Sequence, residues 1–323
     1  MAAYWLQSLT PAAACQLFYV VASLFVLGIT IMPDSAKGLL LSYGPRSQQK
    51  QRQRQTDQKP IAEQSQNANG DAWFIQLLDW ITSIGKVPHS WFAHFYIISV
   101  VCSAFWATQF FTNGRILRSA VSQGSFAMTA SERGMTMDQV VLTWILMSLQ
   151  GGRRLYESLF VMRSSSSRMW FVHWALGLAF YFSTSIAVWA EGSRAILHSR
   201  HQIADLEMPT FKTVLGTLAF FVAWLSQNRC HVYLSTLKKY SLPDRGLFRF
   251  IVSPHYTCEC CLYLALAIVA APAGKPINRT LLCAAMFVAI NLGATAAGTK
   301  QWYEEKFGAD KVRGKWRMIP LVY

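Results

Sequence analysis

The stretch CQLFYVVASLFVLGITIM, residues 15–32, carries no charged side chain and is long enough to cross the hydrocarbon core of a bilayer. Further blocks of mostly apolar residues follow at 91–111, 140–162, 169–190, 214–227, 260–273 and 281–298. The chain of 323 residues is 53% hydrophobic and 14% charged, whereas soluble domains carry about 25% charged residues. We therefore expect an all-α integral membrane protein, a seven-transmembrane-helix bundle forming one domain over residues 1–323.

The distribution of basic residues predicts the orientation of this bundle. Most of the 30 Lys and Arg residues fall after the first, third and fifth apolar blocks and in the C-terminal tail. Because cytosolic loops are enriched in Lys and Arg, we expect a lumenal N-terminus and a cytosolic C-terminus. The net charge of +14 then reflects topology and attraction to anionic lipid headgroups. A phosphate-bearing ligand stays open, but the basic residues are too scattered to favour nucleic acid.

The connection after the first apolar block differs in composition from the rest of the chain. Residues 47–70 are rich in Gln and poor in apolar side chains, which predicts a disordered cytosolic loop. Trp and Leu residues then recur at helical spacing in WFIQLLDWITSIGKVP, residues 73–88. This pattern predicts a helix lying in the membrane interface.

Polar side chains inside apolar segments are the first functional candidates, because they are costly in a membrane and usually face the bundle interior. The second apolar block contains His94 and Tyr96. In the third, Arg153 and Arg154 precede Glu157 by four and three residues, which places opposite charges on neighbouring parts of one helix surface. This group is either a structural ion pair or a carboxylate that orients a reacting group beside cations that meet an anionic ligand.

Two later stretches add further candidates. Gln227, His231 and Lys238 share one helical face, typical of a pathway for a polar, anionic molecule or of a helix end whose polar groups reach the interface. In SPHYTCECCLYL, residues 253–264, the cysteines lie too close together for the separated ligand pairs of a structural zinc site. We expect packing thiols and no metal. No glycine-rich phosphate loop follows a predicted strand, so neither a Rossmann fold nor a P-loop is predicted.

Six short motifs, in order along the chain, resemble the steroid 5α-reductase family, and within it the polyprenol (polyprenal) reductase branch. They are VPHSWFAHFYIISV (87–100), RRLYESLFV (153–161), CHVYLSTLKK (230–239), SPHYTCE (253–259), KQWYEEKF (300–307) and MIPLVY (318–323). The resemblance implies a seven-helix NADPH-dependent enzyme of the endoplasmic reticulum membrane. It further implies reduction of the α-isoprene double bond of a long polyprenyl lipid, on the route to dolichol for protein N-glycosylation.

The resemblance also implies roles for individual residues. Hydride addition to an enal calls for hydrogen-bond donors at the developing enolate oxygen, and the candidates are His94, Tyr96 and Glu157. The motif match implies a cofactor site containing Arg154, Gln227, His231, Lys238, His255, Tyr256, Glu259, Lys300 and Tyr303.

Several alternative functions stay open at this point. Two share the fold: a 3-oxo-steroid 5α-reductase and a trans-2-enoyl-thioester reductase. The Gln-Glu pair of the steroid branch is absent from the second apolar block, which weakens a steroid substrate. From other classes, an S-adenosylmethionine-dependent membrane methyltransferase would share the basic C-terminal region. A seven-helix receptor would not explain charged groups clustered at the predicted cytosolic helix ends.

Overall fold

The computed structural model describes residues 9–40, 69–126, 134–162, 167–198, 209–238 and 240–323. Within these residues the regular elements are helices, apart from one pair of short strands and an isolated bridge between Ile251 and Trp316. Disorder was predicted for the loop over residues 47–70, and of this loop residues 47–68 lie outside the described residues. The helix predicted after it is confirmed as α5, Asn69–Ser83, and its position in the membrane interface stays a prediction.

Every apolar block found in the sequence forms a helix. The helices are α2 (Pro11–Ile31), α6 (Ala93–Phe111), α8 (Met137–Tyr156), α9 (Phe171–Glu191), α11 (Phe211–Thr236), α12 (Pro254–Val269) and α13 (Arg279–Phe307). By length and hydropathy, 4 of the described segments can cross a membrane: α2, α6 with the turn before it, α9 and α13. The chain is therefore an all-α, multi-pass membrane protein, and membrane crossing by α8, α11 and α12 stays a prediction.

Short elements connect these helices. They are α3 (Asp34–Leu40), α7 (Arg115–Phe126), α10 (Ser193–His198), the short helical turns η1 (His89–Phe92), η2 (Glu157–Val161), η3 (Gly246–Arg249) and η4 (Ala309–Lys311), and the strands β1 (Lys86–Pro88) and β2 (Arg168–Trp170). The strands pair antiparallel, with Val87 opposite Met169. This pairing ties the start of α6 to the start of α9.

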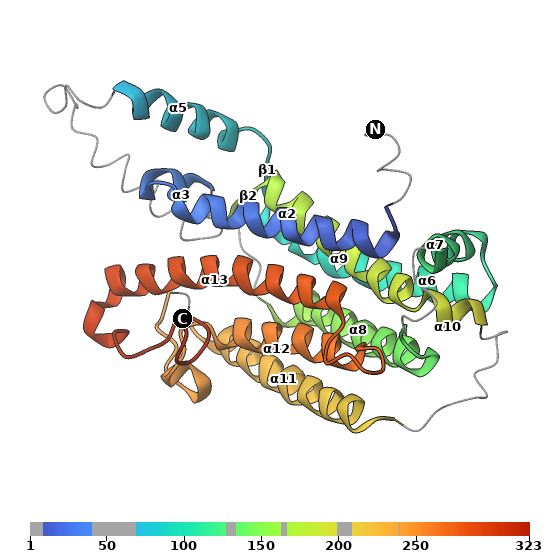
Figure 1. Ribbon diagram of the computed structural model, residues 1–323. Helices are drawn as coiled ribbons and strands as arrows, with labels where there is room; N and C mark the ends of the chain where they lie inside the picture. Colours follow the sequence, from blue (N-terminus) through green and yellow to red (C-terminus); the bar gives the residue numbers. More distant parts are fainter. Residues whose placement is uncertain (1–8, 41–68, 127–133, 163–166, 199–208, 239) are drawn as a thin grey trace, which may run out of the picture.

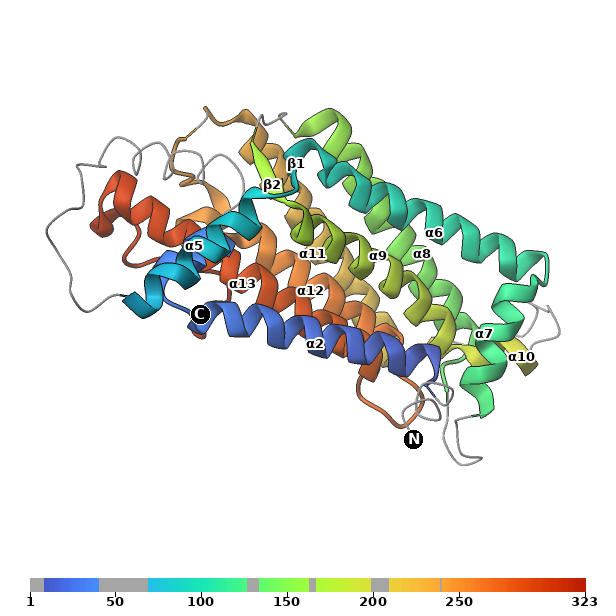
Figure 2. The same ribbon diagram turned by 90° about the horizontal axis from the view of Figure 1, so that it is seen from above.

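The long helices lie side by side, with α11 packed along α12, and α13 packed along both α12 and α2 (Figures 1 and 2). Both views place β1, β2, α5 and the end of α13 at one end of the bundle, together with the connection from α11 to α12. The start of α2, α7 and α10 lie at the opposite end. The C-terminal ends of α2, α8 and α11 and the C-terminal tail thus lie at one end of the bundle, in agreement with the alternation expected from the sequence.

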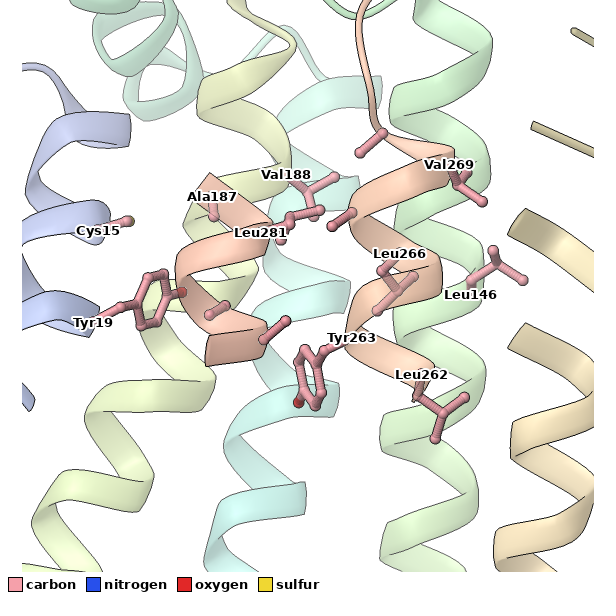
Figure 3. Close-up of a cluster of buried hydrophobic side chains, with 14 of the residues drawn as sticks. Cys15, Tyr19, Leu146, Ala187, Val188, Leu262, Tyr263, Leu266, Val269 and Leu281 are labelled. Carbon is pink, nitrogen blue, oxygen red and sulfur yellow. The ribbon is translucent and has the colours of Figure 1, made fainter. Parts of the chain in front are cut away.

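The interior between the helices is filled by apolar and aromatic side chains. Figure 3 shows Tyr19 of α2, Leu146 of α8, Val188 of α9 and Leu266 of α12 converging on this core, and each is at most 2% exposed. The hydroxyl of Tyr19 donates a hydrogen bond to Thr184 Oγ1 at 3.2 Å, so its polar end is satisfied within the core.

The outward faces of the same helices are also apolar. Ile31, Phe111, Phe160 and Val222 are each more than 60% exposed. A soluble protein rarely exposes so many large apolar side chains together, whereas acyl chains cover them in a bilayer.

Gln139 fixes the position of α8 against α12. Thr136 caps the start of α8 and exchanges hydrogen bonds with Gln139 in a capping box. The Gln139 amide also donates to the carbonyl oxygens of Val269 and Ala271, at 3.0 and 2.8 Å. Because these carbonyls have no helical partner at the end of α12, one side chain closes both helix termini and holds the two helices in register.

Gly216 sets the close approach of α11 to α12, which gives a first prediction. A Cβ at this position would lie 2.9 Å from Val269 Cγ2 and 3.3 Å from the carbonyl oxygen of Ala265. Gly216→Val should therefore force the helices apart and lower the free energy of unfolding by about 1–3 kcal/mol. Thermal unfolding in detergent measures this loss. Gly28→Val in α2 is the matched control, because no atom lies within 4 Å of its added Cβ; equal losses in both variants would contradict the explanation.

Candidate active site

The end of α8 carries a run of polar residues into a π-helical turn, η2. Such turns interrupt regular α-helices and are frequent at functional sites. Glu157, the first residue of the turn, is 0% exposed. A carboxylate taken out of water in this way needs charged or hydrogen-bonding partners.

Four side chains from α8 and α11 surround the Glu157 carboxylate. Oε2 lies 2.5 Å from Arg154 Nη1 and 2.7 Å from His231 Nδ1. Oε1 accepts a hydrogen bond from Asn228 Nδ2 at 2.8 Å and lies 3.4 Å from Arg153 Nη1. The ion pairs predicted from the spacing of Arg153, Arg154 and Glu157 are therefore confirmed.

Arg154 links this carboxylate to Tyr96 of α6. Its Nη2 donates to the Tyr96 hydroxyl oxygen at 2.5 Å, and its guanidinium carbon lies 4.7 Å from the centre of the Tyr96 ring. Both side chains are buried. Because the phenol oxygen accepts a charged hydrogen bond, its own proton is free to be donated elsewhere.

His231 completes this group of buried side chains. We call the group the Tyr96–Glu157 cluster; it consists of Tyr96, Arg154, Glu157 and His231. The Nδ1 atom of His231 lies 2.8 Å from Arg154 Nη1 and 2.7 Å from the Glu157 carboxylate. This nitrogen accepts from the guanidinium in one tautomer and donates to the carboxylate in the other. The His231 ring can therefore change from one tautomer to the other at Nδ1 without moving.

A second set of polar contacts joins α8 to α11 and α12. Arg153 donates to the Trp224 carbonyl at 2.6 Å and to Gln150 Oε1 at 2.7 Å, and it also bonds Gln227 Oε1. The Gln227 amide donates to the Glu259 carboxylate, which also accepts from Gln150 at 3.2 Å. These contacts tie α8 to α11 and α12 beside the Tyr96–Glu157 cluster, two of whose residues, Arg154 and His231, lie on α8 and α11.

Comparison with known proteins shows which family this chain is similar to. The family description 3-oxo-5-alpha-steroid 4-dehydrogenase matches residues 175–323. Polyprenal reductase 1 of Arabidopsis thaliana is 27% identical over 255 residues, which cover 68% of this chain and 77% of that protein. The polyprenal reductases of Drosophila melanogaster and Caenorhabditis elegans are each 28% identical and cover 72% and 69% of this chain, and 74% and 75% of their own lengths.

The chain is similar to the steroid 5α-reductase family over residues 175–323 and to polyprenal reductases over about 70% of its length. This family is one of NADPH-dependent reductases, so the resemblance stated from the motifs is confirmed at the level of the family. The matched residues 175–323 include Gln227, His231 and Glu259. The similarity to the polyprenal reductases covers a larger share of the chain than this part.

Among the residues predicted for the site, six meet near the ends of α6, α8, α11 and α12: Tyr96, Arg154, Glu157, Gln227, His231 and Glu259. His255 borders them. Its carbonyl accepts from the Gln227 amide at 3.2 Å, and its ring lies 5.7 Å from that of His231. Tyr256 packs on His255 with ring centres 4.2 Å apart.

Four predicted residues lie elsewhere. The His94 ring lies 5.2 Å from that of Trp91 and 6.1 Å from that of Trp174. Lys238 is exposed just beyond the end of α11. Lys300 donates to the Lys315 carbonyl at 2.7 Å, and Tyr303 is buried in a small core with Trp302 and Val312.

Sequence reasoning missed three residues that the structure adds to the site region. Asn228 bonds the Glu157 carboxylate, and Gln150 and Trp224 hold Arg153. A signal for Gln150 was present, because it precedes Arg154 by four residues and so shares its helix surface. Asn228 offered no such signal, because its partner lies 71 residues away in the chain.

A second cavity, between the end of α13 and the C-terminal tail, is lined by residues that could bind a phosphate. We call it the tail cavity; it has a volume of about 320 Å³ and is lined by Lys300, Arg313, Gly314, Lys315, Trp316, Arg317, Val322 and Tyr323. Lys315 Nζ donates to the Pro243 carbonyl at 3.1 Å. Partial burial lowers the pKa of Lys315, and the nearby Asp244 carboxylate opposes this shift. The donor set of the tail cavity fits an anionic group such as a phosphate.

Proposed function

We propose that the protein is an NADPH-dependent reductase of the α-isoprene double bond of a long-chain polyprenal, on the route to dolichol for protein N-glycosylation. Two findings support this substrate and reaction: the relatives at 27–28% identity are named polyprenal reductases, and the family uses NADPH. The observation that carries the proposal is the buried Tyr96 hydroxyl held by Arg154 at 2.5 Å.

The Tyr96–Glu157 cluster supplies what reduction of an enal requires from the protein. NADPH, when bound, would supply the hydride for the β-carbon of the double bond, and the enolate left by this addition takes up a proton from water at its α-carbon to give the saturated aldehyde. Tyr96 donates a hydrogen bond to the aldehyde oxygen, where negative charge develops during hydride addition. Because its oxygen accepts from the Arg154 guanidinium, this hydroxyl is a stronger donor than an isolated phenol. Glu157 and His231 hold Arg154 in the required position.

The same chemistry favours the aldehyde over the alcohol as substrate. An isolated allylic alcohol has no carbonyl to accept the charge left by hydride addition, so the hydrogen bond from Tyr96 would stabilise nothing. In an enal the charge reaches the aldehyde oxygen through the conjugated bond. The position of a single strong donor in the cluster therefore supports polyprenal, with polyprenol as the alternative for the test below.

The cofactor is proposed to lie between this cluster and the tail. The motif match assigns Lys238, His255, Tyr256, Lys300 and Tyr303 to NADPH, besides the residues of the cluster and its neighbours. The cationic tail cavity, which contains Lys300, supports a phosphate contact at this end of the bundle. The polyprenyl chain would enter from the bilayer, along the apolar outward faces of the helices.

We further propose that the protein lies in the endoplasmic reticulum membrane, with its N-terminus lumenal and its C-terminus cytosolic. The distribution of Lys and Arg supports this orientation. Under it, the connections after α2, α8 and α11 and the C-terminal tail face the cytosol, where NADPH is available.

The decisive experiment follows NADPH oxidation by the purified, detergent-solubilised protein. Parallel reactions contain a medium-chain polyprenal, the matching polyprenol, a 3-oxo-4-ene steroid and a trans-2-enoyl thioester, and the products are identified by mass. We expect turnover of the polyprenal, with a gain of two hydrogens at the conjugated double bond. Turnover of the steroid alone would assign the activity described for the matched family. No oxidation with any substrate, in folded protein, would contradict a reductase and direct attention to S-adenosylmethionine binding.

Lys238 gives a prediction specific to the cofactor. If its exposed ammonium contacts a phosphate of NADPH, Lys238→Ala should raise the KM for NADPH about tenfold, the loss expected for one charge-assisted hydrogen bond. The KM for the polyprenal should change little. Lys275→Ala is the control, because Lys275 is an exposed lysine of the α12–α13 connection. An unchanged KM for NADPH in Lys238→Ala would remove Lys238 from the cofactor site.

A further inference from the structure

A groove runs along the outside of α11 beside the connection to α12. It has a volume of about 670 Å³ and lies between one face of α11, which includes Arg229 and Tyr233, and residues 245–250 of the connection. We call it the α11 groove. By helical geometry its α11 residues lie roughly a third of a turn away from Gln227 and His231, so the groove opens on a different face of α11 from the Tyr96–Glu157 cluster.

The wall of the α11 groove is held in place by buried contacts. Phe248, 3% exposed, packs against Tyr233 with ring centres 5.5 Å apart and against His255 at 6.1 Å. The Tyr233 hydroxyl donates to the Asp244 carboxylate at 3.0 Å and accepts from the Asp244 amide at 3.3 Å. These contacts anchor the connection on α11, so the groove is a formed part of the fold.

The charge of the α11 groove is entirely positive. Its lining residues include Arg229, Arg245 and Arg249, and no Asp or Glu. Within the described part of the chain, none of these three guanidinium groups forms a hydrogen bond or an ion pair. Guanidinium groups bind phosphate oxygens through paired hydrogen bonds and are weakly hydrated. The groove therefore fits an anion that carries phosphate.

Apolar side chains lie next to these cations. Leu247 and Phe250 of the groove wall are 44% and 59% exposed. On α11 itself, Val222, Leu225 and Val232 are between 44% and 67% exposed. A free phosphate or a dinucleotide would leave this apolar surface exposed to water, whereas the acyl chains of a lipid would cover it. Cations beside an exposed apolar face are typical of contact with the headgroup region of an anionic bilayer.

We propose that the α11 groove binds an anionic phospholipid, with the headgroup phosphate on Arg229, Arg245 and Arg249 and the acyl chains on Leu247, Phe250 and the outer face of α11. This site is separate from the proposed reductase chemistry. Because the connection that forms the groove also contacts His255 through Phe248, bound lipid would steady the residues that border the Tyr96–Glu157 cluster.

The test measures lipid retention by native mass spectrometry of the full-length, delipidated protein, given phosphatidylserine and phosphatidylcholine at equal concentration. Each basic residue near an anionic lipid surface adds to the binding free energy. The loss of two arginines should therefore lower the affinity for phosphatidylserine at least about tenfold. We therefore expect the wild type to retain phosphatidylserine preferentially and the Arg245→Gln/Arg249→Gln variant to lose that preference. Arg115→Gln/Arg118→Gln, which removes two exposed arginines from α7, should behave like the wild type.

Several outcomes would overturn the proposal. Equal retention of the two lipids by the wild type excludes an anionic lipid site, and an unchanged preference in Arg245→Gln/Arg249→Gln places the site elsewhere. If soluble glycerol phosphate displaces the lipid at equal concentration, the groove is a free phosphate site. If Arg245→Gln/Arg249→Gln raises the KM for NADPH and leaves lipid retention unchanged, the groove belongs to the cofactor. Lipid retention does not depend on turnover, so it stays readable if the protein proves not to be a reductase.

Discussion

Glu157→Gln is expected to lower kcat for polyprenal reduction roughly 100-fold, the size of effect seen when one preorganised electrostatic contact is lost. Glu157 does not meet the substrate in the proposed reaction and acts as a positioning residue. Its carboxylate holds Arg154 at 2.5 Å and His231 at 2.7 Å. A neutral amide leaves the buried Arg154 without this counter-charge, so the guanidinium no longer stays fixed on the Tyr96 hydroxyl. Steady-state kinetics with separate titrations of polyprenal and NADPH measures the effect.

A merely structural role for Glu157 predicts a different pattern. Loss of folding would lower the thermal unfolding temperature and the amount of active enzyme, whereas loss of positioning lowers kcat in protein that still unfolds cooperatively. Glu157→Asp keeps the charge and should recover part of kcat. Glu305→Gln, an exposed acid near the end of α13, is the matched control and should be unaffected. Near-normal turnover in Glu157→Gln would remove Glu157 from the mechanism.

Tyr96→Phe is expected to lower kcat by roughly 100- to 1000-fold, because it removes the donor proposed for the developing enolate oxygen. The variant keeps the ring, so packing against Tyr181 at 5.7 Å is retained. It leaves one Arg154 donor without its acceptor at 2.5 Å, which should cost about 1–3 kcal/mol of stability. The KM for the polyprenal should change little, because the lost interaction strengthens only as charge develops. Single-turnover measurement of hydride transfer isolates this step.

Tyr181→Phe is the control for the Tyr96 prediction. Tyr181 packs on Tyr96, and it is the Tyr96 hydroxyl that accepts from Arg154. Near-normal hydride transfer in Tyr181→Phe, together with a large loss in Tyr96→Phe, would assign the effect to the Tyr96 hydroxyl. Equal losses in the two variants would instead indicate disturbed packing and would contradict the role of Tyr96 as donor.

Local features of the site could be predicted from the sequence because they depend on helical spacing alone. Arg153 and Arg154 precede Glu157 by four and three residues, and both ion pairs form. The shared face of Gln227 and His231 likewise brings both side chains into the bundle, where each is less than 10% exposed. The helical periodicity of α11 was sufficient for these two residues. The prediction was wrong for Lys238, the third member of the face, because α11 ends at Thr236 and Lys238 lies exposed beyond it.

Contacts between helices could not be predicted in the same way. Tyr96 and His94 looked equivalent in the sequence, yet Tyr96 meets Arg154 while His94 lies among Trp91 and Trp174. Which of the two faces the cluster depends on the rotation of α6 about its axis. That rotation is set by packing against α8 and α9, and by the strand pair that ties α6 to α9.

The sequence by itself determined the class of the protein, the apolar segments and the resemblance to a known family, because hydropathy, helical period and short motifs are properties of neighbouring residues. Only the tertiary structure decided that Tyr96, Glu157 and His231 meet, since these residues are brought together from α6, η2 and α11. It also decided that residues 245–250 of the connection lie beside Arg229 and Tyr233 of α11 and form the α11 groove. Both results depend on how the helices pack and rotate against one another, which no local pattern encodes.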